Sequence, residues 1–235
     1  NPKLTWEVSC LATMLLAENA SKSNVDQFIY ASSGSVYGVK DEDEVTEELE
    51  LDPISEYNKT KMVSERVLLS YKDKMKIQII RPATVCGYSD RMRLDVAVNL
   101  LTMQALNKGK ITVLGGDQTR PNIHIDDITN VYMHFINNPN FEGIYNAGFE
   151  NISVLDIANM VSLKTNAEIE IKPSNDPRSY RINSDKLLKT GFKPSKTVEN
   201  AIQEMIDLYR NGVLEDLEEN YNLKWMEKNK LYNLD

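Results

Sequence analysis

Glycine is missing from the start of this 235-residue chain, and the first glycine is Gly34. A dinucleotide pyrophosphate is held by a glycine-rich loop at a helix N-terminus, in a pattern such as Gly-x-Gly-x-x-Gly. No such loop can stand upstream of Gly34 within this sequence. The chain also opens on Asn1 and not on Met, and a helical pattern begins almost at once.

Cysteine and histidine are scarce, with two of each in the chain. Cys10 and Cys86 lie far apart and form no Cys-x-x-Cys pair, so we expect free thiols in a reducing compartment. His124 and His134 are too few to support a histidine metal site or a histidine-dependent triad. We therefore predict that no metal is bound.

Long apolar runs and an excess of positive charge are absent as well. No run approaches the roughly 20 apolar residues of a membrane span, and no signal peptide is visible. The net charge of −8 argues against a general nucleic-acid or anionic-membrane surface. With 41% hydrophobic and 26% charged residues, the composition is ordinary for a globular protein. We predict a cytoplasmic protein with neither nucleic acid nor membrane as a partner.

The most informative stretch covers residues 28–61. A short apolar run at 28–31 predicts a buried strand, and Ser-Ser-Gly-Ser-Val-Tyr-Gly follows at 32–38. After an acidic loop, Tyr57 and Lys61 stand at the head of a helical pattern. Residues i and i+4 share one face of a helix, so the Lys61 ammonium can lie near the Tyr57 phenol. A fixed cation stabilises phenolate and lowers a phenol pKa that is ordinarily about 10.

Alone, Tyr-x-x-x-Lys is a weak motif, because a chain with 11 tyrosines contains it about once by chance. Its position shortly after the serine cluster makes it specific. Together the two features resemble the extended short-chain dehydrogenase/reductases, the NAD-dependent sugar-nucleotide epimerases and dehydratases that include UDP-glucose 4-epimerases. The resemblance covers nearly the whole chain, from Thr5 to about Tyr209.

The resemblance implies an α/β fold with a Rossmann-like doubly wound parallel sheet, incomplete at its N-terminal end, and a smaller α+β substrate-binding lobe. The NAD-binding part would comprise 1–85, with 123–150 returning to it. The sugar-nucleotide-binding lobe would comprise 86–122 and 151–212, and 213–235 would form a C-terminal tail. The family's opening βαβαβ half, on the order of 60–80 residues at about 30 per βαβ unit, is expected upstream of Asn1.

The same resemblance implies the residues of the site. Three would be catalytic: Tyr57 as the base for a sugar hydroxyl, Ser33 hydrogen-bonded to that oxygen, and Lys61 holding the Tyr57 pKa down. NAD would be the cofactor, and the residues that contact it would be Ser32, Tyr57, Lys61, Pro82 and Thr84. The substrate would be a nucleoside-diphosphate sugar, bound by Ser33, Ser35, Thr84, Asn99, Arg120 and Arg178.

A second segment, residues 119–127, resembles the family's Arg-x-x-Ile-His-Val-x-Asp sequence. There Arg120 would bind the diphosphate, since a planar bidentate guanidinium suits phosphate oxygens. Arg178 lies where the family has a further nucleotide-binding arginine, with Arg181 as a close alternative. His124 is expected to anchor its strand, and Asp126 or the residue after it to cap the following helix. That helix is expected to bury Ile128, Val131, Tyr132, Phe135 and Ile136.

Two helices carry predicted apolar stripes. The helix at 5–19 is expected to pack on the sheet through Val8, Leu11, Ala12, Leu15 and Leu16. The helix at 57–71 is expected to bury Val63, Val67 and Leu68, with its charged residues on the far face. In the resembling family these two helices pair with their counterparts in a second subunit, which implies a homodimer.

The residues after Ser33 bear on the reaction. The dehydratase branch of the family has an Asp-Glu pair there, to move a proton and eliminate water. Gly34 and Ser35 cannot act as that pair, so 4-epimerisation is favoured over dehydration. A keto-sugar-nucleotide reductase would use the same Ser, Tyr and Lys and stays open, as does a non-catalytic sugar-nucleotide-binding fragment if Asn1 is the native N-terminus. The sugar, the nucleotide and the choice of NAD or NADP are not read from the sequence.

Overall fold

The computed structural model describes residues 1–174 and 179–229, and the chain divides into two compact units. Unit 1 comprises Asn1–Ala83, Ile128–Gly148 and Ile182–Lys193, and unit 2 comprises Thr84–Asp127, Phe149–Arg181 and Pro194–Asp235. The sequence placed all of 151–212 in one lobe, but 182–193 lies in unit 1. The reason is local pairing: Ile182 bridges to Val45, and Ser184 Oγ exchanges hydrogen bonds with the Gly148 backbone.

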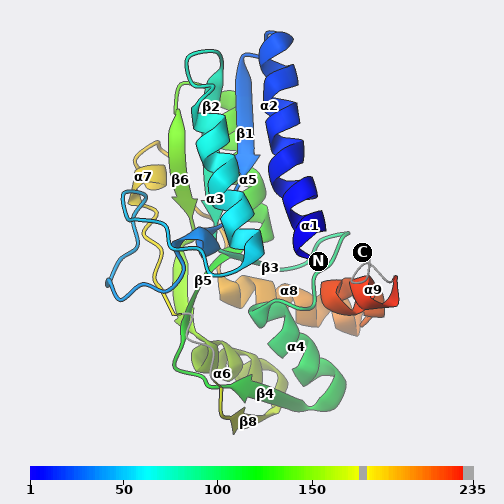
Figure 1. The fold of residues 1–235 in the computed structure, drawn as a ribbon. Helices are drawn as coiled ribbons and strands as arrows, with labels where there is room; N and C mark the ends of the chain where they lie inside the picture. Colours follow the sequence, from blue (N-terminus) through cyan, green and yellow to red (C-terminus); the bar gives the residue numbers. More distant parts are fainter. Residues whose placement is uncertain (175–178, 230–235) are drawn as a thin grey trace. The chain divides into compact units, whose positions relative to one another are not determined.

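Unit 1 is built on a parallel sheet of strand order β1-β2-β6, with bounds β1 Gln27–Ala31, β2 Lys76–Pro82 and β6 Gly143–Ala147. Helix α3 (Glu56–Leu69) covers one face and α5 (Ile125–Asn137) the other (Figure 1). The predicted strand at 28–31 is confirmed. Parallel strands between helical layers are the α/β architecture that the sequence predicted.

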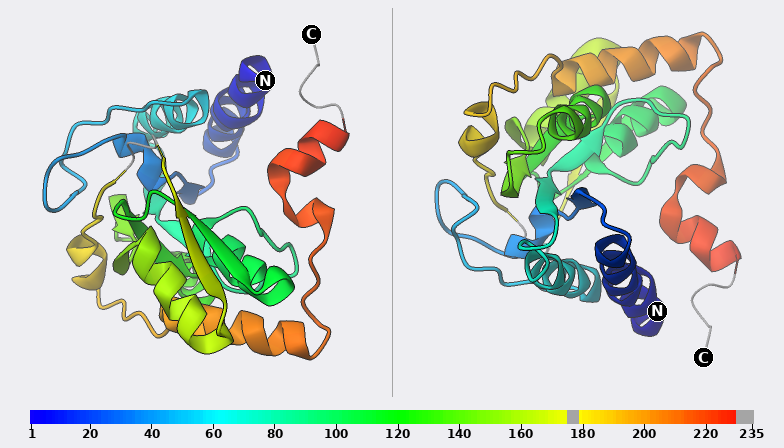
Figure 2. Two further views of the ribbon diagram at one scale, coloured as in Figure 1. Left: turned by 90° about the horizontal axis from the view of Figure 1, so that it is seen from below. Right: turned by 90° about the horizontal axis from the view of Figure 1, so that it is seen from above.

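The N-terminal helical run differs from its prediction. It consists of α1 (Pro2–Thr5), a π-helical stretch (Trp6–Leu11) and α2 (Ala12–Lys22), and it lies beside α3 (Figure 2). The residues it buries are Cys10, Thr13 and Ala17. Most of the predicted stripe is solvent-exposed instead: Val8 (64%), Leu11 (49%), Leu15 (51%) and Leu16 (60%). The prediction that this stripe packs on the sheet is therefore wrong.

Helix α3 also buries a different set of residues from the predicted one. Leu68 is fully buried, whereas Val63 and Val67 are only half-buried. The other buried side chains are polar: Asn58, Thr60, Ser64 and Glu65. The prediction that the charged residues all lie on the far face is wrong for Glu65, which is 1% exposed.

Unit 2 contains two small sheets. In the first, β3 (Thr84–Cys86) pairs parallel with β5 (Thr119–His124), and β5 pairs antiparallel with β7 (Glu150–Ser153). In the second, β4 (Lys110–Leu114) and β8 (Glu168–Lys172) run parallel. Helices α4 (Ala97–Lys108), α6 (Val154–Thr165) and α8 (Val198–Arg210) supply most of an apolar core. Its fully buried members include Val98, Ile111, Ile157, Ala201 and Ile202.

Two helices of unit 2 begin at capping residues, and the start of α5 differs from its prediction. Ser153 caps α6 and accepts a hydrogen bond from Asp156 N. Thr197 caps α8 in a capping box. Helix α5, in contrast, begins at Ile125, so neither Asp126 nor Asp127 is its N-cap. Ile136 of that helix is 51% exposed, so its predicted burial is wrong as well.

The remaining described segments are short. Helix α7 (Asp185–Leu188) belongs to unit 1. The C-terminal tail packs within unit 2, where Leu214 is buried and Leu94 N donates to Asn220 O. A 3₁₀ turn (Glu218–Asn220) and α9 (Asn222–Lys228) end the described chain. Across the described residues, every helix is too short or too polar to cross a bilayer.

Candidate active site

The serine cluster begins where β1 ends. Ser32 N donates to Ile80 O and so extends the pairing of β1 with β2 by one bond. Ser33 is the N-cap of a 3₁₀ turn (Gly34–Tyr37), and its Oγ accepts a hydrogen bond from Ser35 N at 3.2 Å. The sharp change from extended strand to tight turn places Ser33 at the carboxyl edge of the sheet, where α/β folds bind ligands.

A chain of hydrogen bonds joins Ser33 to α3. Ser33 Oγ lies 2.7 Å from Ser35 Oγ, and Ser35 Oγ donates to Asn58 Oδ1 at 2.7 Å. The amide oxygen of Asn58 can only accept a hydrogen bond, so the single hydroxyl proton of Ser35 must be donated to it. Ser33 must then donate to Ser35 while its oxygen accepts from Ser35 N. Asn58 is adjacent to Tyr57, so the serine cluster and the tyrosine are held in one network.

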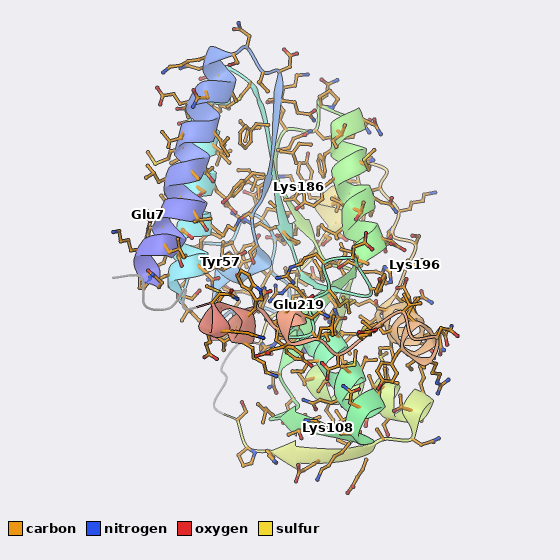
Figure 3. The ribbon with its side chains drawn as sticks, turned by 90° about the vertical axis from the view of Figure 1, so that its right-hand side faces the viewer. Glu7, Tyr57, Lys108, Lys186, Lys196 and Glu219 are labelled. Carbon is orange, nitrogen blue, oxygen red and sulfur yellow. The ribbon has the colours of Figure 1, made fainter. Side chains whose placement is uncertain are left out.

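Tyr57 and Lys61 lie together at the N-terminal end of α3. Ser55 caps the helix by accepting from Asn58 N, and Tyr57 is 46% exposed (Figure 3). Lys61 Nζ lies 5.7 Å from the centroid of the Tyr57 ring and 4.8 Å from that of Tyr30. It donates to Ala31 O at 2.8 Å, the last carbonyl of β1. The predicted proximity of Lys61 to Tyr57 is present.

A buried polar network lies next to these residues. Arg81 binds Glu65 in a bidentate manner, with Nε 3.0 Å from Oε1 and Nη2 2.6 Å from Oε2. Ser32 Oγ donates to the same Glu65 carboxylate. Arg81 Nη1 also donates to Tyr37 OH at 2.7 Å, and Tyr37 OH donates to Asn146 Oδ1 at 2.8 Å. Burial raises the pKa of Tyr37 to about 12, so its phenol stays protonated.

The sequence interpretation missed Glu65, Arg81 and Asn58. Two features of the sequence could have identified the first two. Glu65 follows Lys61 by four residues and so shares its helix face. Arg81 follows the apolar pair Ile79-Ile80 near the end of β2, where a buried cation needs a carboxylate partner. Asn58 had no comparable feature, because only the fold brings it to Ser35.

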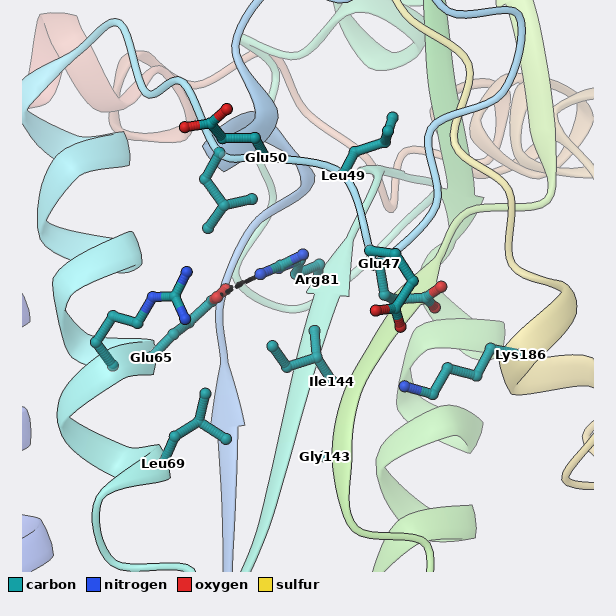
Figure 4. Close-up of a pocket in the computed structure, with 12 residues that line it drawn as sticks. Glu47, Leu49, Glu50, Glu65, Leu69, Arg81, Gly143, Ile144 and Lys186 are labelled. Atoms are coloured by element: carbon teal, nitrogen blue, oxygen red, sulfur yellow. Dashed lines mark hydrogen bonds and ion pairs between the residues drawn. The ribbon is translucent and has the colours of Figure 1, made fainter.

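A cavity of about 420 Å³ lies in unit 1 beside this network (Figure 4). The Arg81–Glu65 pair forms part of its lining, together with Arg66 and Lys186 and the acidic loop residues Glu47, Glu48 and Glu50. Glu47 Oε1 accepts from Asn146 N at 2.7 Å. The cavity is therefore lined by both positively and negatively charged side chains. Within the described residues, no group of three or more His, Cys, Asp or Glu is arranged to hold a metal ion.

The other predicted site residues have varied surroundings. The Ser32 hydroxyl is engaged by Glu65, and Pro82 ends β2 opposite Ala147. Three belong to unit 2, whereas Ser33, Tyr57 and Lys61 belong to unit 1: Thr84 on β3, Asn99 on α4 and Arg120 on β5. Arg178 lies outside the described residues, and its alternative Arg181 is exposed.

Asn99 is used by the fold itself. It is 2% exposed, its Oδ1 accepts from Gly87 N at 3.0 Å, and its Nδ2 donates to Arg93 O at 2.9 Å and to Gly87 O at 3.4 Å. Both amide protons are therefore occupied by loop backbone. Its surroundings do not support the predicted substrate contact, and it orders the loop before α4 instead.

The residues of unit 1 fit one end of a nicotinamide cofactor. An ammonium has three N–H donors, and Lys61 gives one of them to Ala31 O in the described part of the chain. The others suit ribose hydroxyls beside the exposed Tyr57 ring. The given sequence contains no glycine-rich loop to bind the cofactor pyrophosphate before the serine cluster, because its first glycine is Gly34.

Comparison with known proteins identifies the family. Residues 1–148 match the profile of the NAD dependent epimerase/dehydratase family. The chain belongs to this family. The matched region contains Ser33, Tyr57, Lys61 and Arg120, and it includes the Glu65–Arg81 pair. The family is NAD-dependent and has the α/β fold described above.

Three similar proteins illustrate the range of reactions named among the relatives of this chain. The uncharacterized UDP-glucose epimerase YtcB of Bacillus subtilis is 30% identical over 153 residues, 64% of this chain and 48% of that protein. The dTDP-D-glucose 4,6-dehydratase of Bos taurus is 26% identical over 220 residues, 87% of this chain and 61% of that protein. The crystal structure of UDP-glucuronic acid 4-epimerase from Bacillus cereus in complex with NAD has a TM-score of 0.75 and 28% identity, covering 86% of this chain and 67% of that one.

The chain therefore spans about half to three fifths of the length of these two curated relatives. Both epimerases and dehydratases of the family match it. Family membership thus leaves open which of the two reactions takes place, and the residues around Ser33 must be considered for that.

Proposed function

We propose that this protein is an NAD-dependent nucleotide-sugar epimerase that oxidises and re-reduces C4 of a nucleoside-diphosphate hexose, with Tyr57 as the base. The observation that carries the proposal is the placement of Lys61 against the Tyr57 ring, with the serine cluster tied to the same helix through Asn58. Bound NAD would supply the hydride chemistry.

Each of the three side chains has a defined task in this proposal. Tyr57 takes the proton of the sugar hydroxyl through its phenolate oxygen. Lys61 stabilises the phenolate as a nearby fixed cation, which lowers the Tyr57 pKa toward neutral pH. Ser33 would turn its hydroxyl hydrogen from Ser35 to the sugar oxygen, because the one proton of that oxygen goes to Tyr57. Proton transfer of this kind contributes about 10²–10⁴-fold to a rate.

The surroundings of Gly34 and Ser35 favour epimerisation over dehydration. A Cβ added at Gly34 would lie 2.5 Å from Ile182 Cδ1 and 3.2 Å from Pro82 O, so an acidic side chain does not fit there without a shift. Ser35 is committed to hydrogen bonds with Ser33 and Asn58. Neither position offers the acid–base group that water elimination requires.

Substrate and cofactor contacts are part of the same proposal. Arg120 would bind the diphosphate, as would Arg178, and Pro82 and Thr84 would contact the cofactor. The NAD-bound UDP-glucuronic acid 4-epimerase from Bacillus cereus is a precedent for a UDP-sugar substrate. The two cysteines, both buried and free, fit action in the cytoplasm.

A homodimer is a further part of this proposal. The apolar side chains left exposed on the N-terminal helical run would be covered by the same run of a second copy, together with α3. Among them are Leu11 (49%), Leu15 (51%) and Leu16 (60%). Sedimentation of the full-length protein should give twice the monomer mass, and a monomer at micromolar concentration would exclude this arrangement.

The test uses the full-length natural protein, incubated in D2O with UDP-glucose and followed by NMR. A 4-epimerase converts UDP-glucose into its C4 epimer without carbon-bound deuterium, because the same hydride returns to C4. Elimination across C5–C6 would exchange a carbon-bound proton with solvent. A reductase would consume reduced cofactor in proportion to product.

The Tyr57→Phe variant should lose about 10²–10⁴-fold in kcat. Its stability should change little, since Tyr57 is 46% exposed and its ring is retained. Tyr71→Phe serves as the matched control, as a tyrosine at the other end of the same helical segment. Full activity in the Tyr57→Phe variant, or solvent deuterium on the product carbons, would overturn the proposed function.

A further inference from the structure

The Glu65 carboxylate lies between the catalytic helix and the end of β1. We propose that Glu65 is a positioning residue: its buried carboxylate, fixed by Arg81 and Ser32, keeps Lys61 charged and anchors the strand end to which Lys61 donates. The consequence for Tyr57 rests on the proposed function. The effect on Lys61 itself does not, and it can be measured without any catalysis.

Glu65 cannot move freely. Both its oxygens are engaged, with Arg81 Nε and Ser32 Oγ donating to Oε1 and Arg81 Nη2 donating to Oε2. The side chains of Arg81 and Glu65 are 3% and 2% exposed. A bidentate guanidinium holds a carboxylate in one plane as well as in one place. Glu65 is therefore a fixed anion inside unit 1.

The negative end of this ion pair lies on the helix of Lys61. Glu65 follows Lys61 by one turn on α3, whereas Arg81 projects from β2 (Figure 4). Partial burial lowers the pKa of Lys61, and the Glu65 charge opposes that effect. Without the carboxylate, desolvation of the ammonium would act unopposed.

The same carboxylate also fixes the acceptor of Lys61. Lys61 Nζ donates to Ala31 O, and the next residue, Ser32, donates its hydroxyl to Glu65. Glu65 thus determines both the charge of the ammonium and the place of the carbonyl that holds it. The titratable groups that face Lys61 are Tyr30 from β1 together with Tyr57 and Glu65 from α3.

A purely structural alternative is that Glu65 only neutralises the buried Arg81. The two possibilities differ in what happens to Lys61. If Glu65 only compensates Arg81, replacing it changes stability and leaves the titration of Lys61 as it was. If Glu65 sustains the Lys61 charge, replacing it lowers the Lys61 pKa.

The experiment is an NMR titration of ¹³C-labelled lysine in the full-length protein, with the Lys61 resonance assigned from Lys61→Arg. Glu65→Gln should lower the Lys61 pKa by about one unit, which is about a tenfold larger neutral fraction at a given pH. Glu56→Gln is the matched control. Glu56 is on the same helix, but its 2.8 Å ion pair with Lys59 is at the surface, so the Lys61 titration should not move.

Glu65→Gln leaves Arg81 buried without a carboxylate and could fail to fold, so a double variant, Glu65→Gln with Arg81→Met, removes both charges. Its Lys61 pKa should also be lowered, but by less than in Glu65→Gln, because the Arg81 cation is removed as well. An unchanged Lys61 titration in whichever of these variants folds would overturn the proposal.

If the enzyme is a 4-epimerase, the rate provides an additional readout. Lys61 stabilises the phenolate only while it is protonated, so the alkaline limb of the kcat/KM profile should move to lower pH in Glu65→Gln and stay in place in Glu56→Gln. A lowered Lys61 pKa without any epimerase activity would sink the proposed function and leave the inference about Glu65 standing.

Discussion

Each of the two units buries a carboxylate, and the two are held in different ways. Glu65 in unit 1 is 1% exposed and is paired with the Arg81 guanidinium. Asp127 in unit 2 is 0% exposed, and its hydrogen-bond donors within the described residues are neutral: Ser195 N at 2.9 and 3.1 Å, Ser195 Oγ at 2.8 Å and Lys196 N at 3.0 Å.

The difference follows from what each carboxylate does. Asp127 ties the start of α5 to the loop before α8, and backbone N–H groups are sufficient donors for such a clamp. Glu65 lies near Lys61, where the bidentate guanidinium of Arg81 holds its carboxylate in one orientation. The neutral donors around Asp127 hold a loop in place. The ion pair of Glu65 with Arg81 holds a carboxylate in place and also puts a negative charge close to Lys61.

The largest expected effect comes from breaking the ion pair of unit 1. Arg81→Met should lower the free energy of unfolding by about 3–5 kcal/mol, because it leaves Glu65 buried without its counterion. Urea denaturation followed by circular dichroism measures this. The double variant with Glu65→Gln should lose less than Arg81→Met alone. A loss below about 1 kcal/mol for the single variant would mean that water reaches the carboxylate.

A smaller loss is expected for the carboxylate of unit 2. Asp127→Ala should cost about 2–3 kcal/mol, since it removes charge-assisted hydrogen bonds but orphans only neutral donors. Asp126→Ala is the matched control, because Asp126 is the exposed neighbour and its ion pair with Lys196 spans 3.9 Å. The same denaturation measurement applies, and equal losses in the two variants would contradict the clamp.

The smallest expected effect is on the pH dependence of thermal stability, through Glu150 of unit 2. Burial raises the pKa of Glu150, whose Oε2 also accepts from Val198 N at 2.5 Å. A carboxyl with a raised folded pKa contributes stability that is present below its unfolded pKa and is lost as pH rises through the folded value. Glu150→Gln should therefore flatten the fall in thermal midpoint as the pH rises above the ordinary range of a glutamate pKa. An unchanged slope would show that other groups cause the dependence.

Local patterns in the sequence were sufficient for much of the fold and for the centre of the site. The strand before Ser32 and the pairing of Tyr57 with Lys61 at i and i+4 are both present. Each depends on residues within about one helical turn of each other. Interactions of that range are encoded by adjacent side chains and survive whatever the rest of the chain does.

Tertiary structure decided which faces are buried and where the charges go. Two helical faces of the N-terminal run were apolar enough to pack, and contact with α3 selected Cys10, Thr13 and Ala17 over the predicted stripe. In the sequence, Glu65 resembles the other charged residues of a solvent-exposed helix face. In the fold, β2 places Arg81 against it and both side chains are buried. A buried ion can only be recognised together with its partner, because burial alone would be prohibitive. That partner comes from another secondary-structure element, so only the folded chain identifies it.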